Sequence, residues 1–191
     1  MKLKKTLNEN INLKKKLISL ESKIEDTVKL FTNTIKNKGK ILICGNGGSA
    51  ADAQHLAAEF LVRLKPKNNR SAYPVISLAL DTSTLTACGN DLGFSRIFSR
   101  NLEALGQSND ILVVISTSGN SQNIISVLKK AKAMKIKSVG FLGSGGGKAK
   151  KYSNLNIIIP SKITARIQEC HIFLGHYIFE KVENNLKKIK W

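Results

Sequence analysis

The sequence predicts a single α/β domain, built as a doubly wound, five-stranded parallel sheet with helices on both faces and an N-terminal helical extension. Three observations carry this prediction. Short, continuously apolar runs, typical of parallel strands covered on both faces, recur from residue 41 onward. Stretches with the period of an amphipathic helix separate these runs. The chain has 191 residues, the size of one ordinary domain.

Residues 3–36 are predicted to form one or two amphipathic helices. Apolar side chains recur there at steps of three and four residues, and no Gly or Pro occurs before Gly39, where we expect the helix to stop. These apolar side chains must pack against other helices or a partner subunit. We therefore treat residues 1–38 as a helical arm that packs in an oligomer and residues 39–191 as the α/β domain. The apolar residues are Leu13, Leu17, Leu20, Ile24, Val28, Phe31 and Ile35.

From Lys40 onward the chain alternates between predicted strands and helices. The strands are predicted at Ile41–Cys44, Val75–Leu80, Ile111–Ser116, Val139–Leu142 and Leu155–Ile159. The helices are predicted at Ser49–Leu64, Thr84–Cys88, Ser95–Leu105, Ser121–Met134 and about Ile163–Lys188. Such alternation gives right-handed crossovers, and ligands of these folds bind at the carboxyl ends of the strands.

The chain is strongly basic, with 31 Lys and Arg residues against 13 Asp and Glu residues and a net charge of +18. The distribution of this charge argues against a nucleic-acid partner. Residues 1–40 and 181–191 carry ten of the 18 charges, only five of the basic residues are Arg, and aromatic residues make up 6%. Recognition of bases and phosphates favours Arg side chains and stacked aromatic rings. We expect a solvated lysine surface, with a polyanion-binding surface as the alternative.

Neither a membrane span nor a disulfide framework is predicted. No apolar run approaches the ~20 residues that a membrane helix needs, and Asn8, Glu9 and Asn10 interrupt any signal-peptide pattern. The three cysteines are odd in number and form no C-x-x-C motif. The sequence therefore predicts a reduced, cytoplasmic protein without a thiolate metal site.

Two loops at predicted strand ends are candidates for ligand binding. The segment 44–52, Cys-Gly-Asn-Gly-Gly-Ser-Ala-Ala-Asp, ends a strand and opens a helix, so its backbone N–H groups can approach an anion. It also matches a dinucleotide motif loosely, but the next strand ends only at Asp81, which places the expected acidic residue poorly. The segment 116–121, Ser-Thr-Ser-Gly-Asn-Ser, offers four hydroxyls at a helix N-terminus, which suits a phosphate monoester. The alternative is a plain N-cap at Ser121.

A third Gly-rich segment, 143–148, departs from a Walker A loop in its spacing and has Ala149 at the Ser/Thr position. We expect it to be a flexible connector.

His55 and Glu59 are the first candidates for proton transfer or metal binding. Their spacing of four residues places them on one face of a helix, as in a metal-ligand pair, an acid/base pair or an ordinary surface hydrogen bond. The last helix adds further polar groups in an apolar setting. A single His there is more often a core residue with its hydrogen bonds satisfied, and Glu169 can pair with a nearby Lys or Arg. These groups are Gln168, Glu169, His171 and His176.

Taken together, these motifs resemble the bacterial phosphoheptose isomerases, which are SIS (sugar isomerase) domain enzymes of flavodoxin-like fold. The resemblance runs from about residue 40 to residue 183. It implies conversion of sedoheptulose 7-phosphate to D-glycero-D-manno-heptose 7-phosphate through an enediol(ate), the first step toward ADP- or GDP-heptose for lipopolysaccharide or capsule. The motifs are Gly45-Asn46-Gly47-Gly48-Ser49, His55-x-x-x-Glu59, Cys88-Gly89-Asn90-Asp91-x-Gly93-Phe94, Ser116-Thr117-Ser118-Gly119-Asn120-Ser121 and Arg166-Ile167-Gln168-Glu169-x-His171 with His176.

The resemblance also implies a role for each site residue. Glu59 would be the catalytic base and His176 the acid, and both would bind one Zn²⁺ per subunit together with His55 and Gln168. The two roles of Glu59 compete, because a carboxylate bound to zinc is a poorer base. The substrate-binding residues would be Ser116, Thr117, Ser118 and Ser121 at the phosphate, Asn46, Gly47, Ser49, Asp91 and Gln168 along the sugar, and Arg63 reaching a neighbouring site. Ala165 stands where some relatives carry an acidic residue.

Helix geometry constrains this ligand set. Gln168 and His176 are eight residues apart, about 12 Å along a straight helix. Either the helix bends near Gly175, or the site combines residues from two chains, as homotetrameric family members with shared active sites suggest.

The alternative function is that of a family relative, a non-catalytic SIS-domain tetramer that binds a replication initiator. Its pattern replaces the residues corresponding to Glu59 and His176. This sequence retains both residues, which favours the enzyme.

Overall fold

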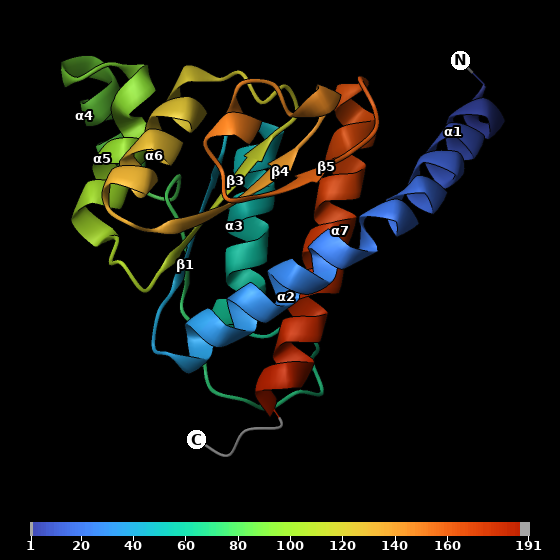
Figure 1. The fold of residues 1–191 in the computed structure, drawn as a ribbon, viewed down its shortest axis with the longest axis horizontal. Coiled ribbons are helices and arrows are strands. Elements are labelled where there is room, and N and C mark those ends of the chain that lie inside the picture. Colours follow the sequence, from blue (N-terminus) through green and yellow to red (C-terminus); the bar gives the residue numbers. More distant parts are fainter. Residues whose placement is uncertain (1, 188–191) are drawn as a thin grey trace.

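The structure, a computed structural model, describes residues 2–187 and confirms the predicted α/β fold. Five parallel strands form one sheet in the order β2-β1-β3-β4-β5. Figure 1 shows this sheet enclosed between helices. The strands are β1 (Ile41–Gly45), β2 (Val75–Ser77), β3 (Ile111–Ser116), β4 (Lys137–Leu142) and β5 (Leu155–Ile158).

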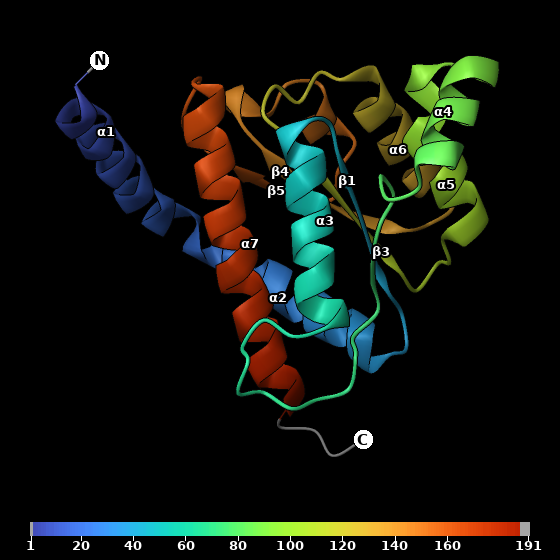
Figure 2. The same ribbon diagram turned by 180° about the vertical axis from the view of Figure 1, so that it is seen from behind.

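The helices cover both faces of the sheet because alternate strand residues point to opposite sides. Ile41 and Ile43 of β1 belong to a core shared with α2, α3 and α7. Leu42 and Cys44 belong to a second core shared with α4, α5 and α6. The view from behind, in Figure 2, shows α3 and α7 side by side. The helices of the α/β domain are α3 (Gly48–Leu61), α4 (Thr82–Asp91), α5 (Ile97–Leu105), α6 (Gln122–Ala133) and α7 (Thr164–Lys187).

The N-terminal arm consists of α1 (Leu3–Lys16), a 3₁₀ turn and α2 (Glu21–Lys36), and α1 extends away from the body in Figure 1. The predicted apolar residues from Leu13 to Ile35 are buried or half-buried, and α2 packs on α7. The Phe31 and Phe179 rings meet edge to face, with centroids 6.1 Å apart. The apolar face of α2 is thus covered within the chain.

The end of α2 differs from its expected form. Lys38 adopts the left-handed conformation, with φ 58°, whereas Gly39 does not. Gly39 is instead needed for a close approach, because a Cβ there would lie 2.3 Å from the carbonyl oxygen of Asn109.

Several predicted boundaries were wrong. β2 ends at Ser77 instead of Leu80, whose side chain is 66% exposed. The next helix, α4, is longer than the predicted Thr84–Cys88, because the Asp81 carboxylate caps its N-terminus by accepting the Ser83 N–H at 3.0 Å. α3 ends at Leu61 instead of Leu64.

At the C-terminal end, α7 is described as far as Lys187, so the predicted end at Lys188 lies outside the described residues. Within residues 2–187, no helix combines the length and the apolar character of a membrane span.

Candidate active site

The two predicted ligand loops lie next to each other at the carboxyl edge of the sheet. β1 and β3 are neighbours, and the chain leaves them toward opposite sides of the sheet, because β2 lies beyond β1 and β4 beyond β3. Such a switch in strand order opens a crevice where ligands of α/β folds bind. The loop after β1 leads into α3, and the loop after β3 leads into α6.

The first loop turns tightly at Gly47, whose φ of 55° suits a residue without a Cβ. The Ser49 N–H donates to the Asn46 carbonyl at 3.0 Å and closes the turn at the start of α3. Ser49 itself is buried, whereas Gly47 is exposed. The loop therefore presents backbone at the helix N-terminus, as predicted.

The second loop is organised by its own hydroxyls. Ser116 Oγ accepts the Gly119 N–H at 3.1 Å, and Ser118 Oγ accepts the Asn120 N–H at 3.2 Å. Ser121 is the N-cap of α6, but its side chain makes no capping hydrogen bond. Among the described residues, the Thr117 and Ser121 hydroxyls form no side-chain hydrogen bond in the fold, so both can donate to a ligand.

The expectation of a flexible connector at residues 143–148 was wrong. The segment forms a 3₁₀ turn at Ser144–Gly146 that packs on the second loop. A Cβ on Gly119 would lie 2.1 Å from the Gly146 carbonyl oxygen, so the two backbones touch. The Lys148 N–H donates to Asn120 Oδ1 at 3.0 Å. This segment braces the candidate phosphate loop.

A reciprocal amide pair joins the two ligand loops. Asn46 Nδ2 donates to Asn123 Oδ1 at 2.9 Å, and Asn123 Nδ2 donates to Asn46 Oδ1 at 2.8 Å. Asn123 is 2% exposed and also accepts the N–H of Ile124. The sequence prediction missed Asn123. A polar residue on the buried face of a helix that opens at a ligand loop is the signal that indicates such a contact.

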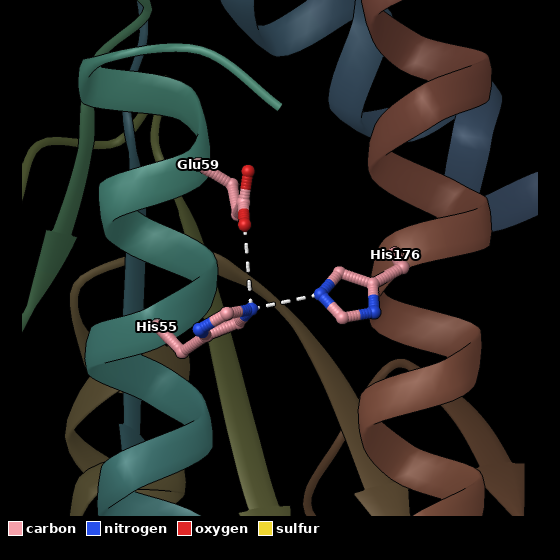
Figure 3. Close-up of side chains that lie close together, drawn as sticks. All are labelled: His55, Glu59 and His176. Atoms are coloured by element: carbon pink, nitrogen blue, oxygen red, sulfur yellow. Dashed lines mark hydrogen bonds and ion pairs between the residues drawn. The ribbon is translucent and has the colours of Figure 1, made fainter. Parts of the chain in front are cut away.

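The structure brings His55, Glu59 and His176 together between α3 and α7, as Figure 3 shows. The Nε2 atoms of His55 and His176 are 2.8 Å apart, and His55 Nε2 is 3.3 Å from Glu59 Oε1. The ligand atoms of all three residues lie within 4.8 Å of one another. The His55 side chain is 51% exposed and that of Glu59 19%, so the cluster is open to a substrate.

This meeting depends on how closely α3 and α7 pack. Gly175 precedes His176 and faces Leu56, the residue after His55, and a Cβ on Gly175 would lie 2.7 Å from Leu56 Cδ1. Because Gly175 has no side chain, α3 and α7 can approach closely enough for the imidazoles of His55 and His176 to touch.

The donor set of the cluster fits a divalent metal. Imidazole nitrogens and a carboxylate oxygen are common Zn²⁺ ligands, and Zn–N bonds of about 2.0–2.1 Å separate tetrahedral ligand atoms by roughly 3.3 Å. The 2.8 and 3.3 Å separations around His55 Nε2 lie close to this value. Two Nε2 atoms in contact otherwise require one imidazole to donate a proton to the other.

Asp52 adds a carboxylate one turn before His55 on α3. Burial raises the pKa of Asp52, and the nearby His55 counteracts part of this rise. Its Oδ2 atom is buried and has no hydrogen-bond partner among the described residues.

Gln168 lies apart from the other proposed ligands. α7 continues as one helix through Gly175, which leaves Gln168 about 12 Å along the axis from His176. A Cβ on Gly48 would lie 2.6 Å from Gln168 Nε2, so this amide rests on the first ligand loop.

The remaining candidates are distributed as follows. Arg63 and Asp91 are exposed, and within residues 2–187 no hydrogen bond or ion pair joins either to the cluster. Glu169 accepts hydrogen bonds from Arg166 and from Asn10 of α1, so the expected local ion pair is confirmed. His171 is fully buried beside Phe141, as expected of a core histidine. The expectation that its hydrogen bonds are satisfied was wrong, because neither ring nitrogen has a hydrogen-bond partner among the described residues.

Comparisons with known proteins agree with this geometry. A model of the SIS domain family matches residues 7–143. A phosphoheptose isomerase of Campylobacter concisus is 50% identical over 94% of this chain and 90% of the relative. A phosphoheptose isomerase of Helicobacter pylori is 47% identical over 91% of this chain and 89% of the relative.

Solved structures agree as well. A phosphoheptose isomerase from Neisseria gonorrhoeae superposes with a TM-score of 0.89 at 38% identity, covering 95% of this chain and 97% of that one. A phosphoheptose isomerase from Francisella tularensis superposes with a TM-score of 0.91 at 33% identity, covering 95% of this chain and 96% of that one. With the shared fold and sequence over nearly its whole length, this chain belongs to the phosphoheptose isomerase family of SIS-domain proteins.

Proposed function

We propose that this protein isomerises sedoheptulose 7-phosphate to D-glycero-D-manno-heptose 7-phosphate. One observation carries the proposal: a carboxylate and two imidazoles from separate helices converge at an open site, and α3, which carries two of these groups, begins at the first ligand loop. His55 lies seven residues beyond the start of α3, about 10 Å along the helix from the ligand loops. A sugar phosphate bound by its phosphate at these loops can extend its carbonyl end toward the cluster.

The chemistry needs a base, an acid and little else. Glu59 removes a proton from C1 of the open-chain ketose, the released electron pair forms the C1–C2 double bond, and the C2 carbonyl oxygen takes a proton from His176. Return of a proton to C2, with loss of the proton on the C1 oxygen, gives the aldose and restores both side chains. General acid–base catalysis of this kind contributes about 10²–10⁴-fold in rate.

We infer that His55, Glu59 and His176, together with Gln168, hold one Zn²⁺ per subunit. The ion would polarise the carbonyl group and stabilise charge that develops on its oxygen. A carboxylate shared with a metal is a weaker base, so the position of Glu59 relative to the two imidazoles decides how well it performs both roles. Because α7 is one helix and Gln168 lies about 12 Å along its axis from His176, the proposed metal contact of Gln168 requires a site that combines residues from two subunits. The same separation supports a contact of Gln168 with the sugar.

The proposed phosphate site consists of Ser116, Thr117, Ser118 and Ser121. Two features support this assignment: the loop lies at the N-terminus of α6, and the Thr117 and Ser121 hydroxyls make no hydrogen bond within the described residues, so they can bind a phosphate. Along the sugar we propose Asn46, Gly47, Ser49, Asp91 and Gln168 as contacts, with Arg63 reaching a neighbouring subunit's site.

We also propose a cytoplasmic homotetramer with active sites at subunit interfaces, into which the arm of residues 1–38 packs beside the domain of residues 39–191. Its support is a row of apolar side chains left exposed on the arm: Leu3 at 73%, Leu7 at 51%, Ile11 at 50% and Ile18 at 72%. In the cell the product would enter ADP- or GDP-heptose synthesis for lipopolysaccharide or capsule.

The test is incubation of the purified protein with sedoheptulose 7-phosphate, with and without added Zn²⁺, while NMR follows the aldose product. The proposal expects the aldose to accumulate to an equilibrium mixture. No turnover under either condition, together with tight binding to a replication initiator, would favour the non-catalytic alternative. The relatives reported above, all named as isomerases, give that alternative no support.

A further inference from the structure

The side chain of Arg70, in the loop between α3 and β2, is buried in the protein. Its side chain is only 5% exposed, and its guanidinium lies over the Tyr73 ring at 4.3 Å. Arg70 Nη2 donates to the carbonyl oxygen of Glu59 at 3.0 Å, and Nη1 donates to that of Phe60 at 2.9 Å. These two carbonyls belong to the last turn of α3, where a helix leaves its acceptors without partners in the helix. The Phe60 carbonyl also accepts the Tyr73 N–H at 3.0 Å, so the Glu59 carbonyl is the one that depends on Arg70. Arg70 therefore caps the turn that carries Glu59.

The same guanidinium is anchored to α7. Arg70 Nε donates to Glu183 Oε1 at 2.5 Å, and Asn68 Nδ2 donates to the other oxygen of Glu183 at 2.8 Å. The Glu183 side chain is fully buried. A buried carboxylate without a partner is strongly unfavourable, so this contact holds the loop and α7 together.

The position of Glu183 on α7 connects it to the proposed site. Glu183 follows His176 by seven residues, which is close to two helical turns, so both side chains lie on the same face of α7. Toward this face, α3 presents His55 and Glu59. The two helices are thus joined at two levels, by the cluster itself and by Arg70 with Glu183.

We propose that Arg70 and Glu183 are positioning residues, which fix the last turn of α3 against α7 so that Glu59 meets the two imidazoles. This inference rests on the proposed function of the cluster. The His55 side chain is 51% exposed, so packing constrains it little, whereas the Glu59 side chain, at 19%, is set by the position of the helix turn that carries it. Catalytic and metal sites need their groups held within about 0.5 Å, which requires a rigid support of this kind.

Two properties separate positioning from a purely structural role. The buried pair can be removed as a whole, because replacing both charges with apolar side chains of similar volume is often neutral for stability. The carbonyl of Glu59 would still lose its donor, whereas that of Phe60 would keep the Tyr73 N–H, which donates to it at 3.0 Å. The double variant Arg70→Met/Glu183→Leu should therefore fold but hold Glu59 loosely, whereas Arg70→Met alone leaves a buried charge and can unfold.

The experiment compares the wild type, Arg70→Lys and the double variant. Metal affinity is measured by competition with a chromophoric chelator, and the visible spectrum of the Co²⁺ form reports the ligand geometry. The matched control is Lys65→Met, which breaks the half-exposed contact between Lys65 and Glu180. This contact joins the same loop to the same helix without touching α3.

We expect the double variant to lose about 10–100-fold in metal affinity, the usual effect of removing a group that orients a ligand. Its Co²⁺ spectrum should change and its kcat should fall, with little change in KM, because the phosphate loop is untouched. The metal affinity and kcat of Arg70→Lys should lie between those of the wild type and the double variant. Lys65→Met should match the wild type in metal affinity, Co²⁺ spectrum and kcat. A folded double variant with wild-type metal affinity, spectrum and kcat would overturn the inference. A wild type that binds metal but does not isomerise the sugar would contradict the proposed function alone.

Discussion

Gly175 of α7 faces the side chain of Leu56 on α3 at a point where a Cβ on the glycine would lie 2.7 Å from Leu56 Cδ1. Each residue has a cluster histidine as its neighbour in sequence. The two helices therefore pack tightly at the level where His55 and His176 meet, with their Nε2 atoms 2.8 Å apart.

Gly175→Ala should weaken metal binding. Alanine favours a helix over glycine by up to about 1 kcal/mol, but here the added methyl must displace Leu56, which is 1% exposed, and so move α3 from α7. We expect a metal affinity reduced by about tenfold or more, measured by chelator competition. The control is Gly89→Ala, also within a helix, where a Cβ meets no atom within 4 Å. Equal metal affinity in both variants would show that the helix approach does not matter.

Glu59→Gln should abolish turnover while binding of a phosphate ester survives. The amide cannot take up the C1 proton, and the expected loss is about 10²–10⁴-fold in kcat. The phosphate loop lies on other elements, β3 and α6, so the affinity for the phosphate end should persist. Steady-state assays and calorimetric titration with a non-reactive sugar phosphate measure the two effects. Retained activity would remove Glu59 from the role of base.

Gly119→Ala should impair substrate binding more than Gly145→Ala does. Both glycines have positive φ, 64° and 76°, so both substitutions cost about 1–2 kcal/mol of backbone strain. Only at Gly119 would the Cβ meet backbone, the Gly146 carbonyl oxygen at 2.1 Å, whereas at Gly145 it meets no atom within 4 Å. We expect KM to rise about tenfold or more for Gly119→Ala alone. Similar KM values in the two variants would contradict the bracing of this loop.

His171 should make the fold sensitive to acid. Burial lowers the pKa of His171 to about 4, whereas a histidine in an unfolded chain titrates near its ordinary value of 6.5. Between these values the unfolded chain binds more protons than the folded one, so the free energy of unfolding falls as the pH falls from 6.5 to 4. At about 1.4 kcal/mol per pH unit, the total loss is about 3 kcal/mol.

Urea denaturation of the wild type and of His171→Leu, compared from pH 4.5 to 7, measures this dependence. The wild type should lose more stability than the variant on acidification, because the two proteins differ only at residue 171. Parallel curves for the two proteins would show that His171 does not contribute.

The fold was predictable because its signals are local. Continuous apolar runs marked the five strands, and both ligand loops follow strand ends, so their place at one edge of the sheet follows from parallel topology. The ends of β2 and α4 were misplaced, since Leu78 to Leu80 continue the apolar pattern after the strand and the capping role of Asp81 was not recognised.

The supporting contacts could not be predicted in the same way. Asn46 and Asn123 are 77 residues apart, and Arg70 and Glu183 are 113 apart. Which side chain meets which across such distances depends on how helices sit on the sheet. Glu183 lies between Val182 and Asn184, so nothing in its local sequence predicts that its carboxylate is buried.

The most direct measurement of the central claim follows sedoheptulose 7-phosphate by ¹H NMR in D₂O with the wild type and with Glu59→Gln. A proton shuttled by an enzyme carboxylate exchanges with solvent, so the wild type should yield heptose 7-phosphate with deuterium at C2, and the variant should yield none above background. Aldose formation at the same rate by both proteins, or no aldose from the wild type with its metal site filled, would contradict the account.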